Sequence, residues 1–331
     1  MIPYTRKTLP NGLTVVVNRD RASKLAAVNI LYRVGARNEN PARTGFAHLF
    51  EHLMFRGTRA VENFDLPVQM ASGDNNAFTN NDYTDFYITL PKDNLETALW
   101  LESDRMEGLD ITPAKLEAEK KVVIEEFRQR YLNQPYGDQT MLLRALAYKV
   151  HPYRWAAIGL ATDHIAGATL ADVESFYRAH YRPSNAILSI SADMEEERML
   201  ELAEKWFAPL ADHPSATAAI PQEPMQTQAR RQEVERDVPA STVTVAYHMC
   251  ARTKLDFYTA DLVSDLLSGG DSGRLYTHLV KERNLLSSVN AYITGDVDPG
   301  LFVFTGQLLP GVTPEAAEAA FREEIEALQT T

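Results

Sequence analysis

The hydrophobic and polar positions along the chain follow two periods, and each period predicts a different kind of element. Short alternating or β-branched runs predict strands, whereas apolar residues that recur every three or four positions predict helices. Thr112 and Pro113 mark one boundary clearly, because a hydroxyl N-cap followed by proline is typical of a helix start. Before residue 212 we expect strands over 13–18, 27–34, 83–90 and 186–193, and helices over 45–55, 94–106, 113–131, 139–149, 170–181 and 195–207.

A second series of elements follows a stretch that has no periodicity. Residues 212–228 are rich in Pro, Ala, Thr and Gln, a composition typical of a linker. A faint internal repeat supports related units, since FYITLPKDNLETALWLE and FVFTGQLLPGVTPEAAEAAFREE both contain a strand, Leu-Pro and a helix. After the linker we expect strands over 241–249 and 301–308, and helices over 256–267, 274–283 and 314–328.

These elements predict an α+β fold with two related domains. Strands mixed with helices, with hairpins early in the chain, favour mixed or antiparallel sheets packed with helices over a doubly wound parallel sheet. The 331 residues of the chain are twice the ~150 that one typical domain needs. We expect a first domain over 1–212, a linker over 213–232 and a second, homologous domain over 233–331. Because the second series has fewer elements, we expect this second domain to be incomplete.

Composition and charge exclude several classes of protein. A chain that is 45% hydrophobic and 24% charged is an ordinary globular protein rather than a disordered one. Its formal net charge of −12 argues against nucleic acid as a partner. The single cysteine, Cys250, excludes an internal disulfide and a thiolate-rich metal site.

The apolar runs are too short for a membrane protein. None approaches the ~18 residues that a membrane-spanning helix needs. The N-terminal stretch MIPYTRKTLPNGLTVVV also lacks the long apolar segment of a secretory signal. We therefore expect no membrane span, and a cytoplasmic location for the chain as it stands or a periplasmic one if a signal has been removed.

The segment GFAHLFEHLMFRG carries the clearest chemical signal. Apolar residues surround most of this predicted helix, yet His48, Glu51 and His52 form one polar stripe at positions i, i+3 and i+4. Burying three ionisable groups is costly unless a partner satisfies them, and a divalent metal held by two imidazoles is such a partner. The spacing is that of the inverted zinc-protease signature, in which the glutamate is the general base. The alternative is two helical histidines with solvent or carboxylate partners.

The third ligand should come from another element, because catalytic zinc needs three protein ligands and one open position. Glu119 and Glu126 are seven residues apart on the predicted helix 113–131, so they lie nearly on one face. We assign Glu126 as the third ligand and Glu119 as the acceptor of a hydrogen bond from a ligand histidine. Glu125 is the competitor, although it points about 100° away. The alternative is a solvated acidic stripe.

Several motifs in order resemble the pitrilysin, insulinase and mitochondrial-processing-peptidase family of zinc proteases. They are NGLTVVV, GFAHLFEHLMFRGT, NNAFTNNDYTDFYITLP, KKVVIEEF and SGRLYTHLVKERNLL. The resemblance implies one Zn²⁺ per chain with His48, His52 and Glu126 as ligands, Glu51 as the base and Glu119 as a supporting carboxylate.

The resemblance also implies a fold and a mode of substrate binding. Members have two related α+β domains per half-molecule, and two halves enclose a peptide chamber. A strand near Asn75, Ala77 and Phe78 is implied to pair with extended substrate through its backbone, which is β-augmentation. From the residues alone, GDNNAFTNND is a polar turn that enters a strand.

One departure from the family pattern suggests a partner. Members place an Arg and a Tyr seven residues apart to bind the substrate carbonyl, and this chain has Val280 and Ser287 at those positions. We therefore expect a heterodimer in which this chain is the metal-bearing subunit and a homologous subunit carries the Arg/Tyr pair. The expected function is a metalloendopeptidase that hydrolyses peptides or unfolded polypeptide segments. The alternative is a non-catalytic peptide-binding or assembly subunit of the same fold.

Overall fold

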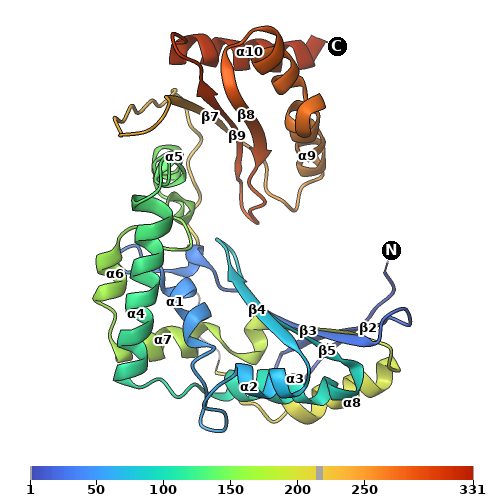
Figure 1. Cartoon of the computed structure of the whole chain (residues 1–331). Helices are drawn as coiled ribbons and strands as arrows, with labels where there is room; N and C mark the ends of the chain where they lie inside the picture. Colours follow the sequence, from blue (N-terminus) through green and yellow to red (C-terminus); the bar gives the residue numbers. More distant parts are fainter. Residues whose placement is uncertain (1, 214–218, 331) are drawn as a thin grey trace. The chain divides into compact units, whose positions relative to one another are not determined.

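The computed structural model describes residues 2–213 and 219–330 (Figure 1). The chain forms two compact units. The first contains residues 1–132 and 150–225, and the second contains residues 133–149 and 226–331. Sheets packed with helices make up both units, so the predicted α+β class is confirmed.

The first unit is built on one six-stranded mixed sheet. All neighbouring strands in it are antiparallel except β2 and β6, which are parallel. Strand β3 alternates between buried positions and exposed or half-buried ones, and β6 alternates between buried and half-buried positions. The order across the sheet is β1 (Thr5–Thr8), β2 (Thr14–Arg19), β6 (Ala186–Ala192), β3 (Leu25–Tyr32), β5 (Thr84–Pro91) and β4 (Asp74–Thr79). Strand β4 is therefore an edge strand.

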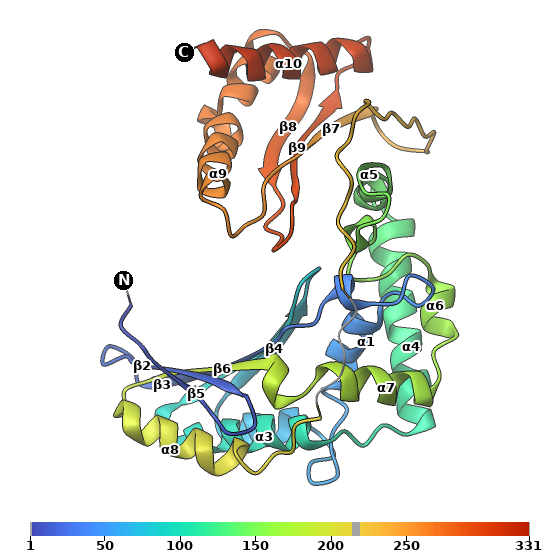
Figure 2. The ribbon, with the colours of Figure 1, turned by 180° about the vertical axis from the view of Figure 1, so that it is seen from behind.

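Helices of the first unit form two groups. One group, α3 and α8, lies along a face of the sheet in both views (Figure 1, Figure 2). In the other group, α1 packs against α4, α7 and the two strands at the β4 edge. The helices are α1 (Phe46–Leu53), α2 (Asp65–Met70), α3 (Leu95–Glu107), α4 (Pro113–Phe127), α6 (Thr162–Ala166), α7 (Leu170–His180) and α8 (Glu196–Phe207).

The second unit has a three-stranded antiparallel sheet. Its core includes Leu267, Leu275, Phe304 and Phe321. The strand order is β7 (Thr242–His248), β9 (Leu301–Leu308) and β8 (Leu286–Ile293), and the helices are α5 (Gln139–Ala147), α9 (Leu255–Ser268) and α10 (Pro314–Thr330).

The segment 133–149 lies in the second unit, whereas the expected first domain, 1–212, included it. The reason is its hydrogen bonding: the Tyr136 hydroxyl donates to the Ala240 carbonyl at 2.8 Å, and the Gln139 amide donates to the Thr244 and Thr305 hydroxyls on β7 and β9. Residues 214–218 of the expected linker lie outside the described residues, and residues 219–232 form no helix or strand.

Some elements differ from the sequence prediction. The predicted helix 113–131 begins at Pro113 with the Thr112 hydroxyl accepting the Lys115 N–H at 3.2 Å, but its α-helical part ends at Phe127. A π-helical turn, Arg128–Leu132, follows. The hydrophobic pattern does not predict strands β1, β4 and β8 or helix α2, because these segments are short, polar or largely exposed. Within the described residues, no helix is long and apolar enough to cross a membrane.

Candidate metal centre

Helix α1 buries a polar stripe because its apolar residues leave no face for solvent. Phe46, Leu49, Phe50 and Leu53 are all at most 3% exposed, and His48 beside them is 8% exposed. Phe50 stacks on the aromatic rings of α7 and the residues after it. His48 is therefore held inside the packed helix, whereas the His52 side chain is 23% exposed.

The start of α1 is fixed by tertiary contacts. Gly45 precedes the helix with φ +91, and a Cβ there would lie 2.8 Å from the Ile158 carbonyl oxygen. The buried Glu39 carboxyl accepts the N–H groups of Gly45 and Ala47 at 2.9 and 2.8 Å. Burial raises the pKa of Glu39 to about 8. Glu39 thus takes the place of the N-cap side chain that Gly45 lacks.

Helix α4 brings Glu126 to the two histidines. Its Oε2 atom lies 3.3 Å from His52 Nε2 and 3.6 Å from His48 Nε2. One ligand atom from each of the three residues lies within 4.8 Å of the others. Among the described residues, this is the one group of three or more His, Cys, Asp or Glu side chains with that geometry. The alternative ligand, Glu125, points outward and is half exposed.

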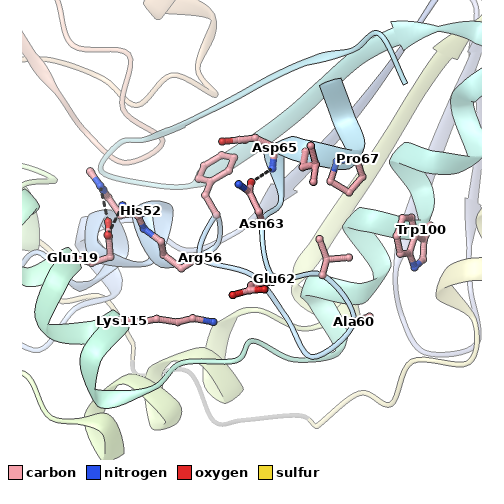
Figure 3. A pocket seen from close by; sticks show the side chains of 13 residues that line it. His52, Arg56, Ala60, Glu62, Asn63, Asp65, Pro67, Trp100, Lys115 and Glu119 are labelled. Carbon is pink, nitrogen blue, oxygen red and sulfur yellow. Dashed lines mark hydrogen bonds and ion pairs between the residues drawn. The ribbon is translucent and has the colours of Figure 1, made fainter. Parts of the chain in front are cut away.

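Glu119 supports the same histidine from the other side. Its Oε2 atom lies 3.4 Å from His52 Nδ1, and its side chain is 1% exposed. Arg56 Nη2 lies 2.5 Å from the second oxygen, Oε1. Figure 3 shows His52 and Glu119 pointing toward each other across one end of a cavity of about 920 Å³. Glu119 can hold the imidazole so that Nε2 faces Glu126.

The electrostatics of the cluster favour positive charge. Burial lowers the pKa of His48 to about 4, so its imidazole is neutral. For His52, burial lowers the pKa, but hydrogen bonds and charge from Glu119 and Glu126 outweigh it and raise the pKa to about 9. The hydrogen bond from His52 lowers the pKa of Glu126.

These residues fit a zinc ion. Ligand atoms at tetrahedral angles and bond lengths of ~2.0 Å are about 3.3 Å apart, which matches the two separations from Glu126 Oε2. Two nitrogens and one oxygen are a ligand set of catalytic zinc, and they leave one position open.

Glu51 lies one turn after His48 and immediately before His52, on the helix that packs against β4. Burial raises the pKa of Glu51, and hydrogen bonding with the Thr79 side chain at the end of that strand opposes the rise. Glu51 is not among the clustered ligand atoms. A half-buried carboxylate with a raised pKa beside a metal site is suited to accepting and returning a proton.

The free edge of β4 presents backbone groups to solvent. The Asn80 N–H donates to the Tyr83 carbonyl across the turn, so these two residues form a hydrogen-bonded pair. Hydrogen-bonded and non-hydrogen-bonded pairs then alternate along β4 and β5 from that pair. Asn75, Ala77 and Thr79 are then the residues whose N–H and C=O point away from β5. Phe78 faces β5 with its backbone and exposes its side chain. The Ala77 N–H meets the Asn76 side-chain oxygen at 2.9 Å.

Sequence reasoning missed Asn76, Glu39, Arg56 and Arg130, which contact the expected site residues or their helix. Glu39 and Arg56 act through tertiary contacts and Asn76 lies on the exposed edge, so none of these three leaves a periodic signal. Arg130 pairs with Glu126 at i, i+4, a spacing too common to mark a site. In the second unit, Val280 packs against the core and the Ser287 hydroxyl lies 3.1 Å from Gln307 Oε1. Neither of these two residues carries a cationic or phenolic group.

Two family models match the chain. Residues 14–155 match a model described as insulinase, peptidase family M16, and residues 167–331 match one described as the peptidase M16 inactive domain. The chain is 33% identical over 327 residues to the zinc protease PqqE of Helicobacter pylori, covering 97% of this chain and 72% of that protein. It is 25% identical over 315 residues to the probable mitochondrial-processing peptidase subunit beta of Arabidopsis thaliana, covering 91% of this chain and 59% of that one.

Solved structures show the same fold. A crystal structure of a protease from Helicobacter pylori aligns with a TM-score of 0.95 and 31% identity, covering all of this chain and 80% of the other. The peptidase M16 inactive domain from Pseudomonas fluorescens aligns with a TM-score of 0.82 and 20% identity, over 93% of this chain and 74% of the other. The second likeness, at 20% identity, concerns the fold alone.

Proposed function

Since this chain belongs to the insulinase, or M16, family of peptidases, we propose that it is a zinc metalloendopeptidase that hydrolyses peptides or unfolded polypeptide segments. The observation that carries the proposal is the convergence of His48, His52 and Glu126 beside Glu51. The name zinc protease on the Helicobacter pylori relative supports the choice of metal.

The proposed roles follow from the positions of the side chains. His48, His52 and Glu126 hold the ion, and Glu119 orients His52 through Nδ1. When bound, zinc supplies Lewis acidity that makes water acidic enough to lose a proton near neutral pH and that polarises a carbonyl. Glu51 accepts the proton of the attacking water and returns it to the amine of the leaving peptide. Its raised pKa suits both transfers.

We propose that substrate binds along the free edge of β4. An extended peptide there would pair with the outward N–H and C=O groups of Asn75, Ala77 and Thr79, displacing the Asn76 oxygen from the Ala77 N–H. The contact between Thr79 and Glu51 puts the end of this strand next to the base. Because backbone groups make these contacts, binding would depend little on the substrate's side chains, and Phe78 contributes through its exposed ring.

We further propose that full activity needs a homologous partner subunit. Val280 and Ser287 cannot donate to the oxyanion that develops on the scissile carbonyl. Donors of this kind typically contribute several kcal/mol to the transition state. A partner that carries the Arg/Tyr pair would supply them, and the isolated chain should bind zinc yet cleave peptides poorly.

The test combines zinc content with cleavage of a quenched fluorescent peptide, measured for the chain alone and with a co-expressed homologue that carries the Arg/Tyr pair. Glu51→Gln should keep one zinc per chain and lower kcat at least about 100-fold. Removal of the metal by a chelator should abolish cleavage, and added zinc should restore it.

Glu125→Gln is the matched control, since it removes one carboxylate from the exposed side of α4. It should leave zinc content and kcat unchanged. A zinc-loaded wild-type pair that captures peptides but cleaves none would instead favour the non-catalytic subunit. Full turnover by the single chain would refute the partner requirement.

A further inference from the structure

The two oxygens of Glu126 have different partners. Oε2 is the atom near both histidines, at 3.3 Å from His52 Nε2 and 3.6 Å from His48 Nε2. Oε1 lies 3.0 Å from Arg130 Nη1. One oxygen therefore faces the proposed ion position, and the other is occupied by a guanidinium.

Glu119 shows the same division. Its Oε2 faces His52 Nδ1 and its Oε1 faces Arg56. Both carboxylates of α4 that face α1 thus lie between a histidine and an arginine. Two independent arginines, one after each helix, produce this arrangement.

Arg130 comes from a distinct local structure. It lies in the π-helical turn Arg128–Leu132, which continues α4 directly beyond Phe127. Such turns are rare and often occur at functional sites. Arg128, in the same turn, pairs instead with Glu125 at 3.7 Å, away from the histidines.

We propose that Arg130 is a positioning residue that presents Glu126 to the metal through a single oxygen. This inference rests on the proposed function, because it concerns the third ligand of the zinc ion. A carboxylate with one oxygen held by a guanidinium cannot rotate freely, so the Glu126 side chain loses less conformational entropy when the ion binds. Arg130 acts through Glu126 and does not itself contact the ion or the substrate.

The charge of Arg130 by itself would weaken zinc binding, which is opposite to the effect of positioning. The positive guanidinium near a divalent cation is repulsive, so its removal should tighten zinc binding if only charge matters. The side chain of Arg130 is 68% exposed, so solvent screens this repulsion and the pair adds little to folding stability. A loss of zinc affinity without a loss of stability is therefore the signature of positioning.

The experiment measures the zinc dissociation constant of the full chain by competition with a fluorescent chelator, at fixed pH and salt. Arg130→Gln should weaken zinc binding about tenfold, the lower end of the effect of residues that orient metal ligands. Arg128→Gln removes the same charge from the same turn and should change the affinity less than about twofold. In a Glu126→Gln background, Arg130→Gln should have almost no further effect, because its partner carboxylate is gone. Thermal unfolding of the metal-free variants should match the wild type.

The possible outcomes distinguish positioning of Glu126 by Arg130 from a simple effect of charge. Three results would overturn the positioning role of Arg130 while leaving the proposed function intact. They are unchanged or tighter zinc binding by Arg130→Gln, an equal loss of zinc affinity in Arg128→Gln, and the same loss from Arg130→Gln with and without the Glu126 carboxylate. A wild-type chain that binds no zinc would overturn the proposed function and this inference with it.

Discussion

Glu39 allows a test of how the helix that carries the metal ligands is held. Its buried carboxyl accepts two N–H groups at the start of α1. In Glu39→Gln one oxygen remains to accept, but an amide NH₂ group replaces the other acceptor and faces a backbone donor. Leaving one buried N–H without a partner costs about 1–3 kcal/mol. We expect the first unit to lose stability by that amount at pH 5.

The same substitution changes the pH dependence of stability. Burial raises the pKa of Glu39 from 4.5 to about 8, so between these values the folded chain holds a proton that the unfolded chain has released. The stability that this group contributes is therefore fully present below pH 4.5 and is lost between pH 4.5 and pH 8, by up to about 1.4 kcal/mol per pH unit. Gln does not titrate, so the stability advantage of wild type over Glu39→Gln should fall steadily from pH 5 to pH 8, by up to about 4 kcal/mol, which is enough to reverse its sign.

The assay is urea unfolding followed by tryptophan fluorescence. All three tryptophans, Trp100, Trp155 and Trp206, lie in the first unit, so the signal reports that unit. Glu174→Gln on the exposed side of α7 is the control and should show no such trend. A stability advantage of wild type over Glu39→Gln that stays constant or grows with pH would refute the reasoning about the buried carboxyl.

Two further predictions concern the start of α1 and the free edge of β4. Gly45→Ala should destabilise the first unit by at least about 1–2 kcal/mol, because φ is +91 and the added Cβ would lie 2.8 Å from a carbonyl oxygen. Urea unfolding measures this loss, and an unchanged unfolding midpoint would show that the substitution causes no strain. Ala77→Pro removes an outward N–H without removing a β4–β5 hydrogen bond, so KM for an extended peptide should rise about tenfold with little change in the free energy of unfolding. Phe78→Pro is the contrasting variant and should disrupt the β4–β5 hairpin. An unchanged KM for Ala77→Pro would argue against pairing along this edge.

The elements that the sequence predicts well have a strong internal period. Helix α1 is apolar around a polar stripe, and the seven-residue spacing of Glu119 and Glu126 is a property of one helix, so both could be assigned before the fold was known. Strand β4 has the sequence DNNAFT and is half exposed, so it resembles a polar turn. Its identity as a strand depends on pairing with β5, which is not a local property.

The partners of the site were beyond sequence reasoning for a similar reason. Glu39 reaches α1 from a loop, and Arg56 reaches Glu119 from the segment after α1. Arg130 is near Glu126 in sequence, but a charged pair at i, i+4 on an exposed helix is common and carries no functional signal. The family resemblance, by contrast, is confirmed because many motifs occur in order along the chain.

The place of β6 in the sheet has a consequence for synthesis of the chain. This strand inserts between β2 and β3, although it is made more than a hundred residues after both. At typical ribosomal rates of 5–20 residues per second, β2 and β3 wait roughly 9–35 s for their shared neighbour. During that interval both have open edges that can pair with other nascent chains. A chaperone that shields these edges, or slow expression at low temperature, should therefore raise the yield of folded protein, and fragments that end before Ala186 should aggregate.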